Sequence, residues 1–147
     1  MKSSFCTIAF QKAKWAKELT VEKPLSEILP IVAEAGFDGV EIWQPHVGLI
    51  SPEQFDAVAR QIRDLRLSVP MLSPYFEFTS SDESAAASMD KARQCLSQAR
   101  KLGATAIRVF TGKVGSAEAT DQQWNRAADC LRQLADESKN DGIAWAL

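Results

Sequence analysis

The feature of this sequence that most constrains its fold is a junction that occurs three times. In each copy a helical pattern ends near a glycine and a short apolar run follows, at residues 35–42 (AGFDGVEI), 102–109 (LGATAIRV) and 140–147 (NDGIAWAL). Glycine is common just after the last turn of a helix, and a short apolar run is typical of a buried strand. The three junctions therefore predict βα repeats whose strands form a parallel sheet.

The segments between these junctions complete the alternation. Two helices begin with capping boxes, Ser51 with Gln54 and Thr120 with Gln123. Pro30 falls inside the first helix, where it either sits in the first turns or bends the axis. The repeat of about 28 to 38 residues is normal for βαβ units. Strands are predicted at residues 5–10, 40–43, 67–72, 106–110 and from residue 143 onward.

Two folds contain five such strands, an open flavodoxin-like sheet and a TIM barrel. The open sheet is disfavoured because the sequence ends on an apolar strand, without the helix that usually covers the last strand. No GxGxxG follows strand one and no GxxxxGK[ST] is present, so the common phosphate-binding loops are missing. Glu41 and Arg108 also lie mid-strand, whereas central strands of doubly wound sheets are usually apolar on both faces.

A barrel accounts for these two charged residues, because barrel strands send alternate side chains inward and alternate strands share an interior layer. We therefore expect Glu41 and Arg108 to lie in one layer. An interior Glu–Arg pair is costly unless each charge is satisfied. The pair is thus either a structural lock or part of a substrate-binding site. The neighbours expected to face the helices are Val40, Ile42, Ile107 and Val109.

The length bounds how much of a barrel is present. A whole (β/α)8 barrel needs roughly 250 residues, so residues 1–147 are predicted to be its N-terminal half, with about four βα units and strand five. Such a half would leave both sheet edges uncovered. We expect either the front of a longer protein or a non-catalytic half-barrel module that assembles as a homo-oligomer or with a partner.

Composition limits the partners and the compartment. The net charge of −2 argues against a nucleic-acid partner, which usually requires a strongly basic face. No apolar run approaches the roughly 18 residues of a membrane span, and the first residues do not resemble a signal peptide. The three cysteines form no CxxC, so neither a disulfide framework nor a thiolate zinc site is expected. A cytoplasmic protein is predicted.

Several side chains follow the predicted strands, where the loops of barrel enzymes build the active site. His46, the only histidine, follows strand two and suits a metal ligand, a proton shuttle or a donor to a sugar hydroxyl. Trp15, Tyr75 and Lys113 lie in the loops after strands one, three and four. The ordinary alternatives are a surface histidine, packed loop aromatics and a solvated lysine. Trp124 lies on a helical stripe and is predicted to be core.

Four stretches, together with His46, resemble the sugar phosphate isomerase/epimerase superfamily, which has a xylose isomerase-like TIM barrel. The strand-two stretch and AIRVFTG are the most specific. Glu41 and Arg108 match the family's strand-two glutamate and strand-four arginine, and His46 matches a histidine that members often place at the pocket. The stretches are residues 25–43 (LSEILPIVAEAGFDGVEIW), 68–75 (SVPMLSPY), 101–112 (KLGATAIRVFTG) and 141–147 (DGIAWAL).

The resemblance implies an enzyme that moves a proton next to a carbonyl group of a small-molecule sugar or sugar phosphate. Members bind Mn²⁺, Mg²⁺, Co²⁺ or Zn²⁺ through acids and histidines of strands five to eight, and the metal holds the substrate's oxygens. The strand-five metal ligand would come directly after Leu147. The chain alone is therefore expected to contain no complete catalytic or metal site and to be inactive.

The superfamily also includes endonuclease IV-like enzymes, which are an alternative to the sugar enzymes. The near-neutral charge and the single histidine count against that alternative, because DNA enzymes need phosphate-contacting Lys and Arg. The substrate-binding candidates are the residues in or just after the strands, where barrel enzymes place the active site. They are Glu41, His46, Arg108, Trp15, Tyr75 and Lys113.

Overall fold

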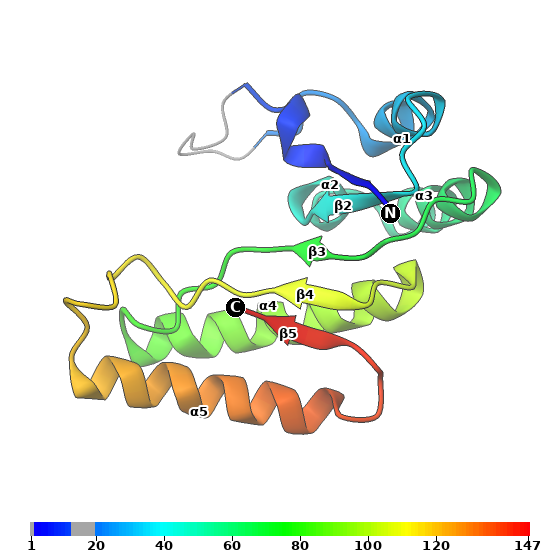
Figure 1. Ribbon diagram of the computed structural model, residues 1–147. Helices are drawn as coiled ribbons and strands as arrows, with labels where there is room; N and C mark the ends of the chain where they lie inside the picture. The colour runs from blue at the N-terminus through cyan, green and yellow to red at the C-terminus, as the bar shows by residue number, and fades with distance from the viewer. Residues whose placement is uncertain (1, 13–19) are drawn as a thin grey trace.

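The strands form one parallel sheet in which spatial order equals chain order. The computed structural model describes residues 2–12 and 20–147. Its five-stranded sheet has the order β1-β2-β3-β4-β5 (Figure 1). This is the arrangement of consecutive βα units in a barrel, and it confirms the predicted alternation. The strands are β1 (Ser4–Cys6), β2 (Gly39–Trp43), β3 (Leu72–Ser73), β4 (Ala106–Arg108) and β5 (Ala144–Ala146).

A helix follows each of the first four strands. Both predicted capping boxes form, at Ser51 and at Thr120. The first helix continues through Pro30 without ending there. Figure 1 shows α4 and α5 side by side beneath β4 and β5. The helices are the 3-10 helix η1 (Thr7–Phe10), α1 (Leu25–Glu34), α2 (Pro45–Gly48), α3 (Pro52–Asp64), α4 (Asp82–Leu102) and α5 (Asp121–Ser138).

The hydrophobic core lies between the sheet and the helices. Burial of this apolar surface is the main force that holds the layers together. As predicted, the apolar residues that alternate with Glu41 and Arg108 belong to it, and all are at most 3% exposed. The strand residues of this layer are Val40, Ile42, Leu72, Ile107 and Val109, and they pack with helix residues that include Ile28, Leu29, Val32, Ile62, Cys95, Leu96 and Ala99.

The prediction of strand one was wrong in its second half. β1 ends at Cys6, and residues 7–10 form the 3-10 helix η1 instead of continuing the strand. Thr7 is fully buried, and its Oγ1 accepts a hydrogen bond from the backbone N–H of Trp43 at 2.9 Å. The Thr7 hydroxyl thus takes the Trp43 N–H, which would pair with a backbone carbonyl if β1 were longer. The backbone therefore leaves the sheet at this point.

Strand three is also shorter than the predicted residues 67–72. Only Leu72–Ser73 is a strand, and upstream there is one isolated bridge between Gly39 and Ser68. Pro70 lacks an N–H group and so interrupts the ladder. The bridge is tight, since a Cβ added to Gly39 would lie 2.3 Å from Ser68 Oγ.

Trp124 was predicted to be core, and this was wrong. Its side chain is 53% exposed in the first turn of α5. It borders a small cavity of about 50 Å³ beside Thr79 and Thr111. The physical reason is that α5 packs mainly on α4 and β5, and these contacts leave Trp124 largely uncovered. Among residues 2–12 and 20–147, no helix combines the length and apolarity that crossing a membrane would require.

Candidate functional site

The inner face of the sheet, opposite the helices, carries a row of polar side chains. Strand pairing places Cys6 beside Glu41 and Trp43 beside Ser73. Paired residues of parallel strands point to the same face, and successive residues of one strand point to opposite faces. Because Ile42 and Ile107 face the helices, Glu41, Ser73 and Arg108 all project from the inner face.

Glu41 and Arg108 do share one interior layer, as the sequence predicts. Arg108 Nη1 lies 3.4 Å from Glu41 Oε1, and the two side chains are 28% and 22% exposed. Ser73, from the strand between them, donates its hydroxyl to the same Glu41 oxygen at 2.5 Å. Three adjacent strands therefore contribute one residue each to a connected polar cluster.

Two aromatic rings flank the guanidinium of Arg108. The Tyr75 and Phe110 rings stack with centroids 5.6 Å apart and planes at 14°. The Arg108 carbon Cζ lies 4.9 Å from the Phe110 centroid and 6.0 Å from that of Tyr75, within cation–π range. The predicted site residue Tyr75 thus joins the cluster.

Part of the Arg108 guanidinium remains unsatisfied. Its Nε is buried and has no hydrogen-bond partner among the described residues. Buried polar groups of this kind are uncommon, because an unmade hydrogen bond costs about 1–3 kcal/mol. The buried Nε is shielded from a ligand, but the side chain as a whole is 28% exposed, and the terminal N–H groups of a guanidinium held in this way suit a carboxylate, a phosphate or a hydroxyl group.

Phe110 and Ser73 were not predicted as site residues. β4 ends at Arg108 and not at residue 110, yet Phe110 is two residues further on and returns to the same face. The period of two along an extended chain could have identified it. Ser73 could not be recognised in the same way, since the short β3 became apparent only in the structure.

Cys6 is the last residue of β1 and lies beside Glu41 on the inner face. Burial raises the pKa of the Cys6 thiol, and the negative charge of Glu41 raises it further. The thiolate is the nucleophilic form of cysteine. Cys6 is therefore a neutral thiol at physiological pH and a poor nucleophile.

His46 lies in α2, and it is buried rather than in an exposed loop. Its side chain is 1% exposed, and the ring meets that of Trp43 edge-on at 5.5 Å. Gln11 Nε2 lies 3.4 Å from His46 Nε2, and the Gln11 carbonyl accepts the Glu22 N–H at 3.2 Å. The amide group of Gln11 therefore donates, and His46 Nε2 accepts.

Burial lowers the pKa of His46, against the opposing effect of the nearby Thr7 carbonyl. The imidazole is thus neutral at physiological pH. The partners of His46 are Gln11 and Trp43, whereas those of Glu41 are Ser73 and Arg108. The ring instead borders a cavity of about 470 Å³ between α1 and α3. The surface-histidine alternative was wrong, and a role of His46 in substrate binding stays a prediction.

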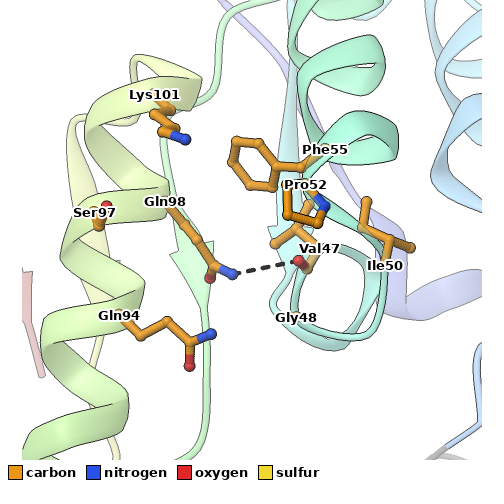
Figure 2. A pocket seen from close by; sticks show the side chains of 9 residues that line it. All are labelled: Val47, Gly48, Ile50, Pro52, Phe55, Gln94, Ser97, Gln98 and Lys101. Carbon is orange, nitrogen blue, oxygen red and sulfur yellow. Dashed lines mark hydrogen bonds between the residues drawn. The ribbon is translucent and has the colours of Figure 1, made fainter.

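Besides the cavity beside His46, a groove lies in the helix layer, between α4 and the segment that joins α2 to α3. Figure 2 shows Gln98 of α4 pointing across this groove, where its Nε2 donates to the Val47 carbonyl at 3.3 Å. Lys101 Nζ lies 5.7 Å from the centroid of Phe55. The groove measures about 240 Å³ and is lined by side chains of the helices and their connections. It belongs to the helix–helix packing and contains none of the inner-face residues.

Of the two remaining predicted residues, the structure describes Lys113. Lys113 is exposed, and its backbone N–H, rather than its side chain, donates to Glu77 at 3.2 Å. Trp15 lies outside the described residues. Within the described part of the chain, no three His, Cys, Asp or Glu side chains converge as a metal site would require.

A family model for the xylose isomerase-like TIM barrel matches residues 29–147. The chain belongs to this family. The resemblance seen in the sequence is thereby confirmed, and the five parallel strands are the N-terminal part of the family's barrel. Because active sites of such barrels lie at the carboxyl ends of the strands, the cluster around Arg108 is where one is expected.

The chain is similar to a dehydratase both in sequence and in structure. The 3-dehydroshikimate dehydratase of Bacillus anthracis is 24% identical over 139 residues, which cover 92% of this chain and 46% of that protein. A crystal structure of the probable 3-DHS dehydratase of petrobactin synthesis, from the same organism, has a TM-score of 0.76 and 24% identity, covering 100% of this chain and 52% of that one.

Two epimerase structures share the fold. D-psicose 3-epimerase, in the presence of D-fructose, has a TM-score of 0.76 at 17% identity and covers 99% of this chain and 51% of that chain. L-ribulose 3-epimerase has a TM-score of 0.73 at 22% identity and covers 100% of this chain and 49% of that chain. The chain therefore spans about half the length of the relatives that it matches.

Proposed function

We propose that this chain forms the N-terminal half of an enzyme that moves a proton next to a carbonyl group of a small polyhydroxylated substrate. The observation that carries the proposal is the inner-face cluster of Glu41, Ser73 and Arg108, flanked by Tyr75 and Phe110. Stacked rings suit the apolar face of a sugar or carbocycle. A guanidinium with a spare donor suits its oxygen substituents.

In this proposal Arg108 binds the substrate and Glu41 orients it. The carboxylate of Glu41 is already engaged by Ser73 and Arg108 through one oxygen, so we assign it an orienting role rather than that of the base. Tyr75 forms part of the substrate wall. His46 is retained as a substrate-binding candidate because of its position after β2 and the family resemblance. Lys113 and Trp15 are retained because of their positions in the loops after strands four and one.

The first candidate reaction is isomerisation or epimerisation of a sugar or sugar phosphate. It is supported by the likeness of the fold to D-psicose 3-epimerase and L-ribulose 3-epimerase. Removal of a proton next to a carbonyl, followed by its return to another position or face, accounts for both reactions.

The second candidate is the dehydration of a cyclic hydroxy keto acid. It is supported by the dehydratase of B. anthracis, which aligns with 92% of this chain. It also starts with loss of a proton next to a carbonyl, and a hydroxide then leaves as water. The cation of Arg108 on the inner face favours an anionic substrate, since it could pair with a carboxylate.

Dependence on a divalent metal is part of the proposal for the whole protein. The family resemblance points to Mn²⁺, Mg²⁺, Co²⁺ or Zn²⁺, with ligands after Leu147. The described residues do not fit such a site, because they hold no cluster of three or more ligand side chains and Glu41 is engaged by Arg108. We therefore expect the 147-residue chain to be inactive alone.

The proposed partners are small molecules, with neither nucleic acid nor a membrane among them, and the proposed compartment is the cytoplasm. The net charge of −2 supports this for nucleic acid, which requires many phosphate-contacting cations. A second copy of the chain remains a proposed partner of the half barrel. Sedimentation of the purified 147 residues tests it, since a self-completing half barrel should form a dimer.

The test of function uses the protein encoded by the complete gene, beside the 147-residue chain. Each is incubated with 3-dehydroshikimate, followed by the ultraviolet absorbance of the conjugated product, and with D-fructose and D-psicose, followed by sugar chromatography. Turnover of one substrate that is lost with a chelator and restored by a divalent metal supports the proposal. Absence of all these activities, or full activity of the 147 residues alone, contradicts it.

A further inference from the structure

One carboxylate joins the two loops that carry the aromatic pair. Glu77 lies two residues after Tyr75 in the loop that follows β3. Its Oε1 accepts the Thr79 hydroxyl at 2.8 Å, and its Oε2 accepts the backbone N–H of Lys113 at 3.2 Å. Lys113 lies three residues after Phe110 in the loop that follows β4. The side chain of Glu77 therefore connects both loops just beyond the stacked rings.

The backbone of the β4 loop passes very close to this carboxylate. A Cβ added to Gly112 would lie 2.3 Å from Glu77 Oε1 and 2.1 Å from Thr79 Oγ1, far closer than any ordinary contact. The Phe78 N–H also donates to the Thr111 carbonyl at 2.8 Å. The two loops fit together in this way because residue 112 has no side chain.

The loop after β3 has a separate attachment to α4. The Glu77 N–H donates to Ser88 Oγ at 2.8 Å, and Lys91 Nζ donates to the Tyr75 carbonyl at 3.1 Å. Neither bond involves the Glu77 carboxylate. The loop after β3 is thus fixed to the helix layer independently, whereas the loop after β4 is held against it by the carboxylate and one backbone bond.

The ionised form of Glu77 is the one that these bonds stabilise. Burial acts to raise the pKa of Glu77, but the hydrogen bonds from Thr79, Ser80 and the Lys113 backbone outweigh it and lower that pKa below its usual value. The side chain is therefore a carboxylate at physiological pH, and both of its oxygens can accept.

We propose that Glu77 is a positioning residue, whose carboxylate holds the β4 loop against the β3 loop and so keeps Phe110 stacked on Tyr75 beside Arg108. The effect of Glu77 on substrate binding rests on the function proposed above, whereas its effect on the stacking of Phe110 and Tyr75 does not. Glutamine could keep both contacts, because its carbonyl can accept from the Lys113 N–H while its NH₂ group donates to the Thr79 hydroxyl. Methionine at this position keeps the length of the side chain and removes both acceptors, so the contact with the β4 loop would be lost.

The chain offers a direct probe of this geometry, because Tyr75 is its only tyrosine. Labelling with fluorotyrosine gives one fluorine NMR resonance, which reports the stacking of Tyr75. We expect the resonance to shift and broaden in Glu77→Met and in Gly112→Ala. The matched control is Glu118→Met, an exposed glutamate in the same β4 loop, which should leave the resonance unchanged.

A resonance that stays in place in folded Glu77→Met, while Tm falls, would mean that Glu77 only stabilises the chain and would overturn the proposal. An equal shift in Glu118→Met would overturn it as well. If Glu77→Met does not fold, Gly112→Ala decides. The added methyl group would collide with the carboxylate where it now lies, so an unchanged Tyr75 resonance in that folded variant contradicts the proposal.

A second readout concerns the protein encoded by the complete gene. Misplacement of substrate-binding groups can cost on the order of a hundredfold in rate, so Glu77→Met should lower kcat/KM at least roughly tenfold. Lack of activity in the unmutated protein would refute the proposed function but leave the fluorine experiment valid. A shifted resonance with unchanged kcat/KM would refute only the link to substrate.

Discussion

The two faces of the sheet use the same strands for different purposes. Ile42, Leu72 and Ile107 are fully buried against the helices, while Glu41 and Arg108 retain 22% and 28% of their side-chain exposure on the inner face. The helix-facing residues are packed in the core, and the inner-face residues form a sparse polar cluster. Alternate residues of one strand thus serve stability on one face and are available for ligand binding on the other.

The largest effect should come from the helix-facing side. Leu72→Ala is expected to lower the free energy of unfolding by about 2–5 kcal/mol, because a fully buried side chain would leave a cavity. Urea denaturation measures the loss. The control is Leu49→Ala, at a leucine that is 60% exposed, where a change within about 0.5 kcal/mol is expected. Equal losses in both variants would contradict the assignment of Leu72 to the core.

The end of β1 provides the next effect. Thr7→Val keeps the shape of a fully buried side chain but removes the acceptor of the Trp43 N–H. A buried donor without a partner costs about 1–3 kcal/mol, and urea denaturation should show that loss. Thr20→Val, at an exposed threonine, is the control and should be close to neutral. An unchanged midpoint in Thr7→Val would mean that this bond does not terminate the strand.

The alternation of the strands could be predicted because it is a local property of the sequence. The glycine junctions mark where strands begin, and the period of two places Glu41 and Arg108 opposite Ile42 and Ile107. Both capping boxes were likewise readable, since each depends on two residues three positions apart. These features need no information about distant parts of the chain.

The parts that could not be predicted depend on distant contacts. The buried partner of the His46 ring nitrogen is Gln11, which lies 35 residues away along the chain. β1 is short because Thr7 pairs with the backbone of β2. The role of Glu77 becomes visible only when the β4 loop lies against it. A propensity or a period contains no information about such pairs.

His46 breaks the simple division into two faces, since it is a titratable group inside the packed layer. Burial lowers its pKa in the folded chain, so the unfolded chain binds the proton more readily. Stability should therefore fall as pH drops below about 6.5, the ordinary histidine value, by at most about 1.4 kcal/mol per pH unit. Urea midpoints at about pH 7.5 and 5.5 on either side of that value measure it.

Because His46 is the only histidine, no other imidazole contributes to the change in stability over that pH range. His46→Gln should flatten the dependence between the two pH values while keeping a polar side chain. Glu118→Gln, at an exposed carboxylate, should leave the slope unchanged. A wild-type chain that becomes more stable on acidification would show that His46 gains a partner when protonated, contrary to the neutral state inferred here.

The smallest expected effect is the coupling energy between Glu41 and Arg108, and it distinguishes a structural role of this pair from a ligand-binding role. A double-mutant cycle with Glu41→Gln and Arg108→Met measures their coupling energy, which should be about 0–1 kcal/mol for partly exposed charges. The exposed Arg93–Glu137 pair, at 3.0 Å, provides a reference cycle of similar size. A coupling above about 3 kcal/mol would identify a structural lock, and the inner face would then be part of the stabilising core. A small coupling would mean that the pair contributes little to stability. Ligand binding would then be the reason that Arg108 is held there with a donor to spare.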